Sequence, residues 1–256
     1  MAISTSAQAA SAAELAPLRT QIDAIDSQLV ELLAARAKVT AEVGRVKQQY
    51  ALPLYVPERE LSLLKARREQ AEHIGVSAEL VEDVLRRVMR ESYQTQETGF
   101  VCCREGGGKV VIVGGGGALG QRFASLFTRS GYQVVVLETA DWPNATAIVA
   151  DAALVLIAVP IHATLQVISQ LPPLPADCVL ADLTSVKAAP LQTMLAQHNG
   201  PVLGLHPMFG PDISNIVKQV VVVCNGRNAD HYQWLLQQFK VWGDKKKKKT
   251  AEQHDE

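Results

Sequence analysis

The chain has 256 residues, 48% hydrophobic and 20% charged, which suits one or two globular domains with their own cores. Its net charge is −1, and outside the lysines at 245–249 it carries 20 basic against 26 acidic residues, a balance that favours no nucleic-acid partner. The four cysteines have no C-x-x-C spacing, which predicts reduced thiols and no metal site. The sequence shows no apolar run of membrane length and no signal peptide, which predicts a cytoplasmic protein without a membrane partner.

Residues 14–97 have the apolar spacing of helices, after an Ala- and Ser-rich extension at 1–13 that we expect to be disordered. Apolar residues recur at steps of three and four from Leu15 to Val46, which predicts a helix from near Leu15 to about Gln49. Pro17 must then lie in its first turn. This helix is roughly 50 Å long, too long to bury its apolar stripe against two shorter helices, so it requires a partner helix from another chain or the same chain.

Two shorter helices complete this all-α domain. Pro57 stands at or beside the start of the second helix, and Gly75 ends it. Ser77 caps the third helix, which runs to about Gln96.

After an expected linker at 98–109, residues 110–243 alternate short apolar strands with helical segments. Strands are predicted at 110–113, 133–137, 154–159, 179–181, 202–205 and 220–223. This alternation predicts an α/β domain with a mostly parallel, doubly wound sheet of the Rossmann type.

A glycine-rich turn joins the first strand of this domain to a helix. In Val110 to Gly120 the glycines at 115, 117 and 120 suit a tight turn, a close approach to pyrophosphate and close helix–strand packing. Glu138 ends the next strand, where a carboxylate accepts both ribose hydroxyls of NAD and repels the extra phosphate of NADP. A ligand-free turn is the alternative. The residues expected at the NAD site are Gly115, Gly117, Ala118, Leu119, Gly120, Glu138 and Pro160.

In the first helix, cationic side chains are spaced to surround a small anion. Arg36 and Lys47 are 11 residues apart, which returns to within about 20° of the same face with Cα atoms roughly 16 Å apart. Arg19 lies roughly 25 Å before Arg36 and about 100° round the helix, so only a second copy could bring it to the same ligand. In the third helix the apolar stripe continues into Ser92 and Gln96, as in a polar cavity wall or a solvated helix end.

These residues resemble the all-helical chorismate mutases. The resemblance rests on Leu-Arg19-x-x-Ile-Asp, Leu-Leu-Ala-Ala-Arg36, Val-Gly-Arg-Val-Lys47, Pro57-Glu-Arg59-Glu60, and Glu91-Ser92 followed by Gln96. It implies an intertwined homodimer that converts chorismate to prephenate. In it, Arg36, Arg59 and the partner's copy of Arg19 hold carboxylates, and Ser92 also holds a carboxylate. Lys47 and Gln96 would donate to the ether oxygen, and Glu60 would accept from the ring hydroxyl.

The strand ends of the second domain carry Pro160-Ile-His162, Thr184-Ser185-Val-Lys187 and His206-Pro-Met-Phe-Gly210. With the glycine loop they resemble prephenate dehydrogenases, and the whole chain resembles the bifunctional T-proteins of tyrosine biosynthesis. The resemblance implies that His206 accepts a hydrogen bond from the substrate hydroxyl and that Ser185 orients it, while NAD takes the hydride and CO₂ is lost. A structural role for His206 is the alternative.

The resemblance ends after Gly243, where we expect 244–256 to be an aberrant, disordered Lys-rich tail left by a truncation or frameshift, with the dehydrogenase impaired. A nuclear-import or nucleic-acid patch is the other interpretation of Lys245–Lys249. Two alternatives to a T-protein remain: a mutase with a non-catalytic nucleotide-binding module, and an unrelated NAD reductase with a helical dimerisation arm.

Overall fold

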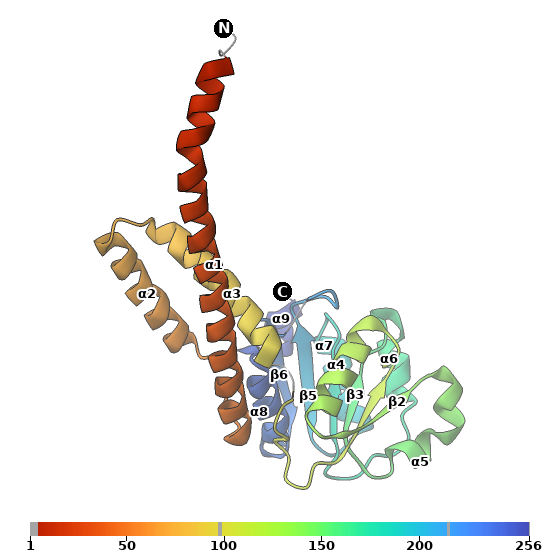
Figure 1. Cartoon of the computed structure of the whole chain (residues 1–256). Helices are drawn as coiled ribbons and strands as arrows, with labels where there is room; N and C mark the ends of the chain where they lie inside the picture. The colour runs from red at the N-terminus through yellow and green to blue at the C-terminus, as the bar shows by residue number, and fades with distance from the viewer. Residues whose placement is uncertain (1–4, 97–98, 214–215, 256) are drawn as a thin grey trace.

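The computed structural model describes residues 5–96, 99–213 and 216–255. Three helices form one half of the molecule and an α/β unit forms the other, with the N-terminal part of the longest helix projecting beyond both (Figure 1). No helix in the described part is both long and apolar enough to cross a membrane.

The helical half consists of α1 (Thr5–Gln49), α2 (Pro57–His73) and α3 (Ala78–Gln96). The predicted C-terminal end of α1 and both ends of α2 and α3 are confirmed, and the Ser77 hydroxyl caps α3 by accepting from the Leu80 N–H at 3.2 Å. The predicted start of α1 near Leu15 is wrong. Residues 5–13 are helical rather than disordered, and Pro17 lies inside α1. The alanines at 7, 9, 10, 12 and 13 favour a helix strongly enough to continue it past one missing hydrogen bond.

The α/β half is built on a seven-stranded sheet in the order β2-β1-β3-β4-β5-β6-β7. Its pairs are parallel except β5 with β6, which confirms the predicted doubly wound class. The strands are β1 (Lys109–Val113), β2 (Gln133–Leu137), β3 (Ala152–Ile157), β4 (Val179–Asp182), β5 (Val202–Pro207), β6 (Val220–Arg227) and β7 (Lys245–Lys248). The helices are α4 (Ala118–Arg129), α5 (Ala145–Val149), α6 (Ile161–Ser169), α7 (Ala188–Gln197), α8 (Gln233–Trp242) and α9 (Ala251–Asp255), with 3₁₀ turns at Thr139–Asn144 and Ala229–Tyr232.

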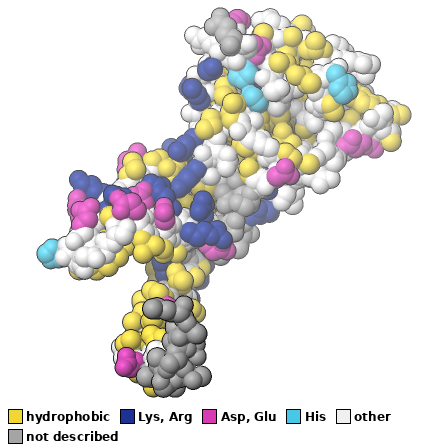
Figure 2. Space-filling model, turned by 90° about the horizontal axis from the view of Figure 1, so that it is seen from above, with side chains coloured by type: hydrophobic (Ala, Val, Ile, Leu, Met, Phe, Trp, Pro, Cys, Tyr) yellow, Lys and Arg dark blue, Asp and Glu magenta, His cyan; other side chains and the backbone are white. Residues whose placement is uncertain are grey.

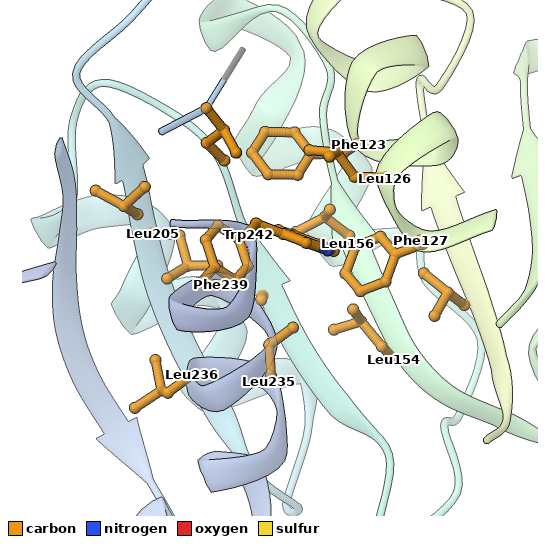
Figure 3. Packing of buried hydrophobic residues seen from close by; sticks show 14 of the residues in the cluster. Phe123, Leu126, Phe127, Leu154, Leu156, Leu205, Leu235, Leu236, Phe239 and Trp242 are labelled. Carbon is orange, nitrogen blue, oxygen red and sulfur yellow. The ribbon is translucent and has the colours of Figure 1, made fainter. Parts of the chain in front are cut away.

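Helices cover both faces of this sheet, since its central strands are apolar on both sides. On one face α4 and α8 pack through aromatic rings, with Phe127 and Trp242 edge to face at 5.0 Å between centroids (Figure 3). On the other face α5, α6 and α7 cover a second cluster. The expected linker has neither helix nor strand over residues 99–108, and its last residue, Lys109, begins β1; Phe100 within it is buried in the first cluster.

The lysine run is ordered, contrary to the prediction of disorder. Residues Lys245–Lys248 form β7, which pairs in parallel with β6 at the edge of the sheet. The Lys245 N–H donates to the Gln219 carbonyl at 2.7 Å, and the Lys249 N–H donates to the Val223 carbonyl at 3.1 Å. Main-chain pairing does not depend on side-chain charge, and lysines suit an edge strand because they discourage pairing with other chains.

Candidate functional site

The three helices and the loop between α1 and α2 line an open cavity of about 380 Å³. Arg36 and Lys47 both line it, as their spacing along α1 predicted. Arg59 and Glu60 enter from α2 and Ser92 from α3, so five of the seven candidate residues of this half meet here. The full lining is Arg36, Val39, Thr40, Val43, Lys47, Leu54, Val56, Arg59, Glu60, Leu63, Met89, Ser92 and Tyr93.

Hydrogen bonds hold the polar wall of this cavity. The Arg36 guanidinium donates through Nη1 to Ser92 Oγ at 2.7 Å, and the Ser92 hydroxyl donates to the Val88 carbonyl at 2.9 Å. The polar residues that continue the apolar stripe of α3 therefore line the cavity as far as Ser92, so this part of the helix is not a solvated helix end. The side chain of Gln96, which ends α3, lies outside the described residues.

Lys47 and Glu60 are both anchored within this cavity. The Lys47 ammonium donates to the Leu54 carbonyl at 2.5 Å, and burial lowers the pKa of Lys47. Glu60 is only 6% exposed, and its carboxylate accepts from the Tyr93 hydroxyl at 3.0 Å and from the Lys218 ammonium at 2.5 Å. Burial and the Glu60 charge raise the pKa of Tyr93. Sequence reasoning missed Tyr93 and Lys218, because neither repeats a motif and Lys218 belongs to the other half.

Arg19 is not in this cavity. It is exposed on α1 and is not among the residues that line the cavity. An uncovered apolar stripe runs along the same helix, and its exposed members are Leu15, Leu18, Ile22, Ile25, Leu29, Val30, Leu32, Leu33, Val39, Val43 and Val46. The described chain thus places Arg19 apart from Arg36, as the spacing predicted.

A second cleft, of about 570 Å³, opens at the carboxyl ends of β1, β2 and β3. In doubly wound sheets, ligands bind outside the carboxyl ends of the strands, at the point where the strand order reverses. Of the seven residues predicted for the cofactor, six line the cleft: Gly117, Ala118, Leu119, Gly120, Glu138 and Pro160. His162 lines it as well.

The glycine loop differs in one detail from the prediction. The left-handed turn is at Gly114, with φ +77°, whereas Gly115 packs against Val136, 2.9 Å from where a Cβ would be. Gly120 has the predicted packing role, since a Cβ there would lie 2.7 Å from the Gly115 Cα. Gly117 precedes α4, so the N-terminus of that helix faces the cleft.

Glu138 is exposed at the end of β2 and fixes the shape of the loop. Its carboxylate accepts from the Gly116 N–H at 2.5 Å, and its own N–H donates to the Asp141 carboxylate at 2.8 Å. The carboxylate therefore lies where the glycine loop and the second strand meet, beside the helix N-terminus.

His206 lies near the end of β5, half-buried, and shares a hydrogen bond of 2.8 Å between its Nδ1 and Nε2 of His254. His254 Nδ1 lies 2.8 Å from Asp255, whose carboxylate accepts from the Lys187 and Ala188 N–H groups. Burial lowers the pKa of His206, and the charges of His254 and Lys187 add to the effect. His206 therefore lies near the end of β5 and is also held by its hydrogen bond with His254.

Ser185 is exposed in the loop after β4. Beside it the Lys187 ammonium is buried, with its Nζ 2.5 Å from Asp182 Oδ2 and donating to the Leu205 carbonyl at 2.7 Å. Lys187 thus links Asp182 at the end of β4 to Leu205 of β5. A role for Asp182 is not apparent from the sequence, because this residue ends a strand whose other residues are all apolar.

Two family models match this chain. The model described as chorismate mutase type II matches residues 18–97, and the model described as prephenate dehydrogenase, nucleotide-binding domain, matches residues 133–248. The second match extends through most of the lysine run, so the expectation that the resemblance ends after Gly243 is wrong.

Among curated relatives, the T-protein of Enterobacter agglomerans is 56% identical over 245 residues, which are 95% of this chain and 66% of that protein. The T-protein of Haemophilus influenzae is 49% identical over 243 residues, 94% of this chain and 64% of that protein. The chain thus spans slightly less than two thirds of these relatives' length.

Among solved structures, prephenate dehydrogenase from A. aeolicus, in complex with hydroxyphenyl propionate and NAD⁺, matches with a TM-score of 0.51 and 17% identity over 58% of this chain and 62% of that one. Synechocystis arogenate dehydrogenase matches with a TM-score of 0.50 and 19% identity over 57% and 61%. At such identities the likeness supports the fold of the α/β half alone.

Proposed function

We propose that this chain, which belongs to the T-protein family, carries two enzyme activities of tyrosine biosynthesis. The helical half converts chorismate to prephenate, and the α/β half oxidises prephenate with NAD⁺ to 4-hydroxyphenylpyruvate and CO₂. The observation that carries the proposal is the single cavity that collects Arg36, Lys47, Arg59, Glu60 and Ser92.

The chemistry of the first reaction suits this cavity. Chorismate rearranges to prephenate by a pericyclic step that breaks one C–O bond and forms one C–C bond, so it needs neither a nucleophile nor a general base. Fixed donors accelerate such a step by holding the reactive conformer and stabilising the charge that develops on the ether oxygen. Arg36, Arg59 and Ser92 would bind carboxylates. Lys47 with Gln96 would donate to the ether oxygen, and Glu60 would accept from the ring hydroxyl.

Substitution of Lys47 tests the first activity. Lys47→Ala removes a donor to the developing charge, so chorismate turnover should fall by about 10²–10³-fold. Lys38→Ala is the matched control, since Lys38 is exposed on the same helix and does not line the cavity. Near wild-type turnover in Lys47→Ala, with Lys38→Ala also active, would refute the assignment of this cavity.

The mutase site is proposed to be shared between two copies of the chain in a homodimer. The exposed stripe on α1 requires a partner, and Arg19 would reach the cavity of the other copy. Mixing Arg19→Ala chains with Arg36→Ala chains tests this arrangement. Each mixed dimer should regain one intact site, whereas no recovery after exchange would show that Arg19 does not serve the partner.

The second activity is proposed for the cleft at β1–β3 and the neighbouring strand ends. The residues there fit NAD⁺: the α4 N-terminus suits a pyrophosphate, and Glu138 suits ribose hydroxyls. When bound, NAD⁺ supplies a hydride acceptor. His206, kept neutral by its lowered pKa, would take the proton of the substrate hydroxyl through Nε2, and Ser185 would orient that hydroxyl.

Addition of NAD⁺ and prephenate separates this proposal from its alternative. NADH formation that His206→Asn abolishes, with NAD⁺ affinity unchanged, supports a dehydrogenase. Tight NAD⁺ binding without turnover supports a nucleotide-binding module instead.

We further propose a cytoplasmic location, which agrees with four cysteines that are all free thiols.

A further inference from the structure

One side chain of the α/β half reaches into the helical half. Lys218 precedes β6, and its N–H donates to the Gly243 carbonyl at 2.9 Å while its backbone has a left-handed φ of 66°. The neighbouring Ile216 and Val217 are buried in the same core cluster as Leu54, from the loop between α1 and α2. The backbone that carries Lys218 is therefore fixed against the helical half. Figure 2 shows basic side chains gathered on the helical half and where the two halves meet.

The Lys218 ammonium lies against a wall of the mutase cavity. Its Nζ is 2.5 Å from Glu60 Oε1 and lies 5.1 and 5.6 Å from the ring centroids of Tyr55 and Tyr93. The Tyr93 hydroxyl donates to the other oxygen, Glu60 Oε2, at 3.0 Å. Both carboxylate oxygens are thus held, one from each half of the molecule.

Among the described residues, Lys218 is the cation nearest to this carboxylate. Arg86 lies farther away, with Nη1 3.6 Å from Glu60 Oε1, and its 44% exposed side chain also binds Glu82. A buried carboxylate without a close cation is strongly disfavoured, so the contact with Lys218 holds the Glu60 side chain in its direction.

From this geometry we infer that Lys218 is a positioning residue for the mutase reaction: the α/β half orients Glu60 toward the substrate hydroxyl. The inference rests on the proposed function of the cavity. It makes the mutase site depend on the contact between the two halves, so that the helical residues alone do not complete it.

The docking of the α1–α2 loop supports the same dependence. The Leu54 N–H donates to the Val241 carbonyl at 3.3 Å, and the Leu54 carbonyl accepts from Lys47. The loop that connects Lys47 to Glu60 is therefore attached to α8 of the other half. Two of the candidate mutase residues are thus held through contacts that cross the junction.

The test compares substitutions in the full chain. Lys218→Met keeps the aliphatic stem and removes the charge, so kcat/KM for chorismate should fall at least tenfold, about 1.4 kcal/mol. Most of the change should be in KM, because Glu60 holds the ring hydroxyl before and during the reaction. Lys218→Arg should restore most of the activity, and Lys218→Gln, which also lacks the charge, replaces the Met variant if that does not fold.

Lys245→Met is the matched control. The Lys245 ammonium lies 5.2 Å from the same Tyr55 ring, but no ion pair joins it to Glu60 in the described part of the chain. Its kcat/KM should stay within about twofold of wild type, since weak exposed contacts contribute little. An equal loss in both variants would show a general effect of removing charge at the junction and overturn the inference.

A double-mutant cycle with Glu60→Gln separates positioning from stability. In the Glu60→Gln background Lys218→Met should have less than a twofold further effect, because the carboxylate that Lys218 holds is gone. The same tenfold loss in both backgrounds, or wild-type kinetics in Lys218→Met, would overturn the inference and leave the mutase assignment intact. A wild-type chain that does not consume chorismate would refute the proposed function, and this inference with it.

Discussion

Asp244 follows α8 and is 9% exposed, with no hydrogen-bond partner for either carboxylate oxygen among the described residues. Burial raises its pKa from 3.8 to about 7, although the nearby Lys246 charge acts in the opposite direction. The fold therefore favours the neutral acid. Its contribution to stability is complete below the unfolded pKa and is lost as the pH rises through the folded value.

The size of this loss follows from the two pKa values. With values of 3.8 unfolded and about 7 folded, raising the pH from about 5 to about 8 removes roughly 2–3 kcal/mol of the free energy of unfolding. Asp244→Asn keeps the shape and cannot ionise. Any cost of burying its amide is the same at both pH values, so only the ionisation term changes between them.

Urea denaturation of the wild type and Asp244→Asn at about pH 5 and about pH 8 measures this term. The stability of the variant relative to the wild type should rise by roughly 2–3 kcal/mol between the lower and the higher pH. Asp83→Asn, at an exposed position on α3, is the control and should show no such difference. An equal effect of Asp244→Asn at both pH values would refute the argument that Asp244 is buried and neutral.

Three further substitutions test other parts of the structure. Glu138→Ala removes the carboxylate at the cofactor cleft, so NAD⁺ affinity by calorimetry should fall about tenfold or more; an unchanged affinity would contradict the assignment. Gly120→Ala brings a Cβ to 2.7 Å from the Gly115 Cα, so NAD⁺ binding should be lost and thermal unfolding should begin earlier, whereas wild-type values would refute the close packing. Leu29→Glu puts a charge on the apolar stripe of α1, where Leu29 is 52% exposed, and should shift the proposed dimer to monomer in sedimentation; a dimer that persists in the variant would place the interface elsewhere.

Local patterns in the sequence predicted much of the fold and of the cavity. Both ends of α2 and the start of α3 follow from Pro57, Gly75 and Ser77, which act within a single turn. The shared face of Arg36 and Lys47 follows from the helical period alone. These features depend on residues that are close in the chain, and the structure confirms them.

The features that the sequence did not reveal depend on distant contacts or on main-chain pairing. Glu60 and Lys218 are 158 positions apart, and no periodicity connects them. The strand at Lys245–Lys248 forms because β6 offers an open edge, while the side chains alone suggest repulsion. The turn at Gly114 rather than Gly115 depends on how four consecutive glycines share one bend, which composition does not decide.

The most direct test of the account is the consumption of chorismate by the purified chain, followed by ultraviolet absorbance, beside an Arg36→Ala variant. The cavity that collects Arg36, Lys47, Arg59, Glu60 and Ser92 predicts turnover at an enzymatic rate, on the order of 1–10³ s⁻¹, with a loss of orders of magnitude in the variant. A folded wild-type chain that consumes chorismate no faster than the variant would contradict the central claim.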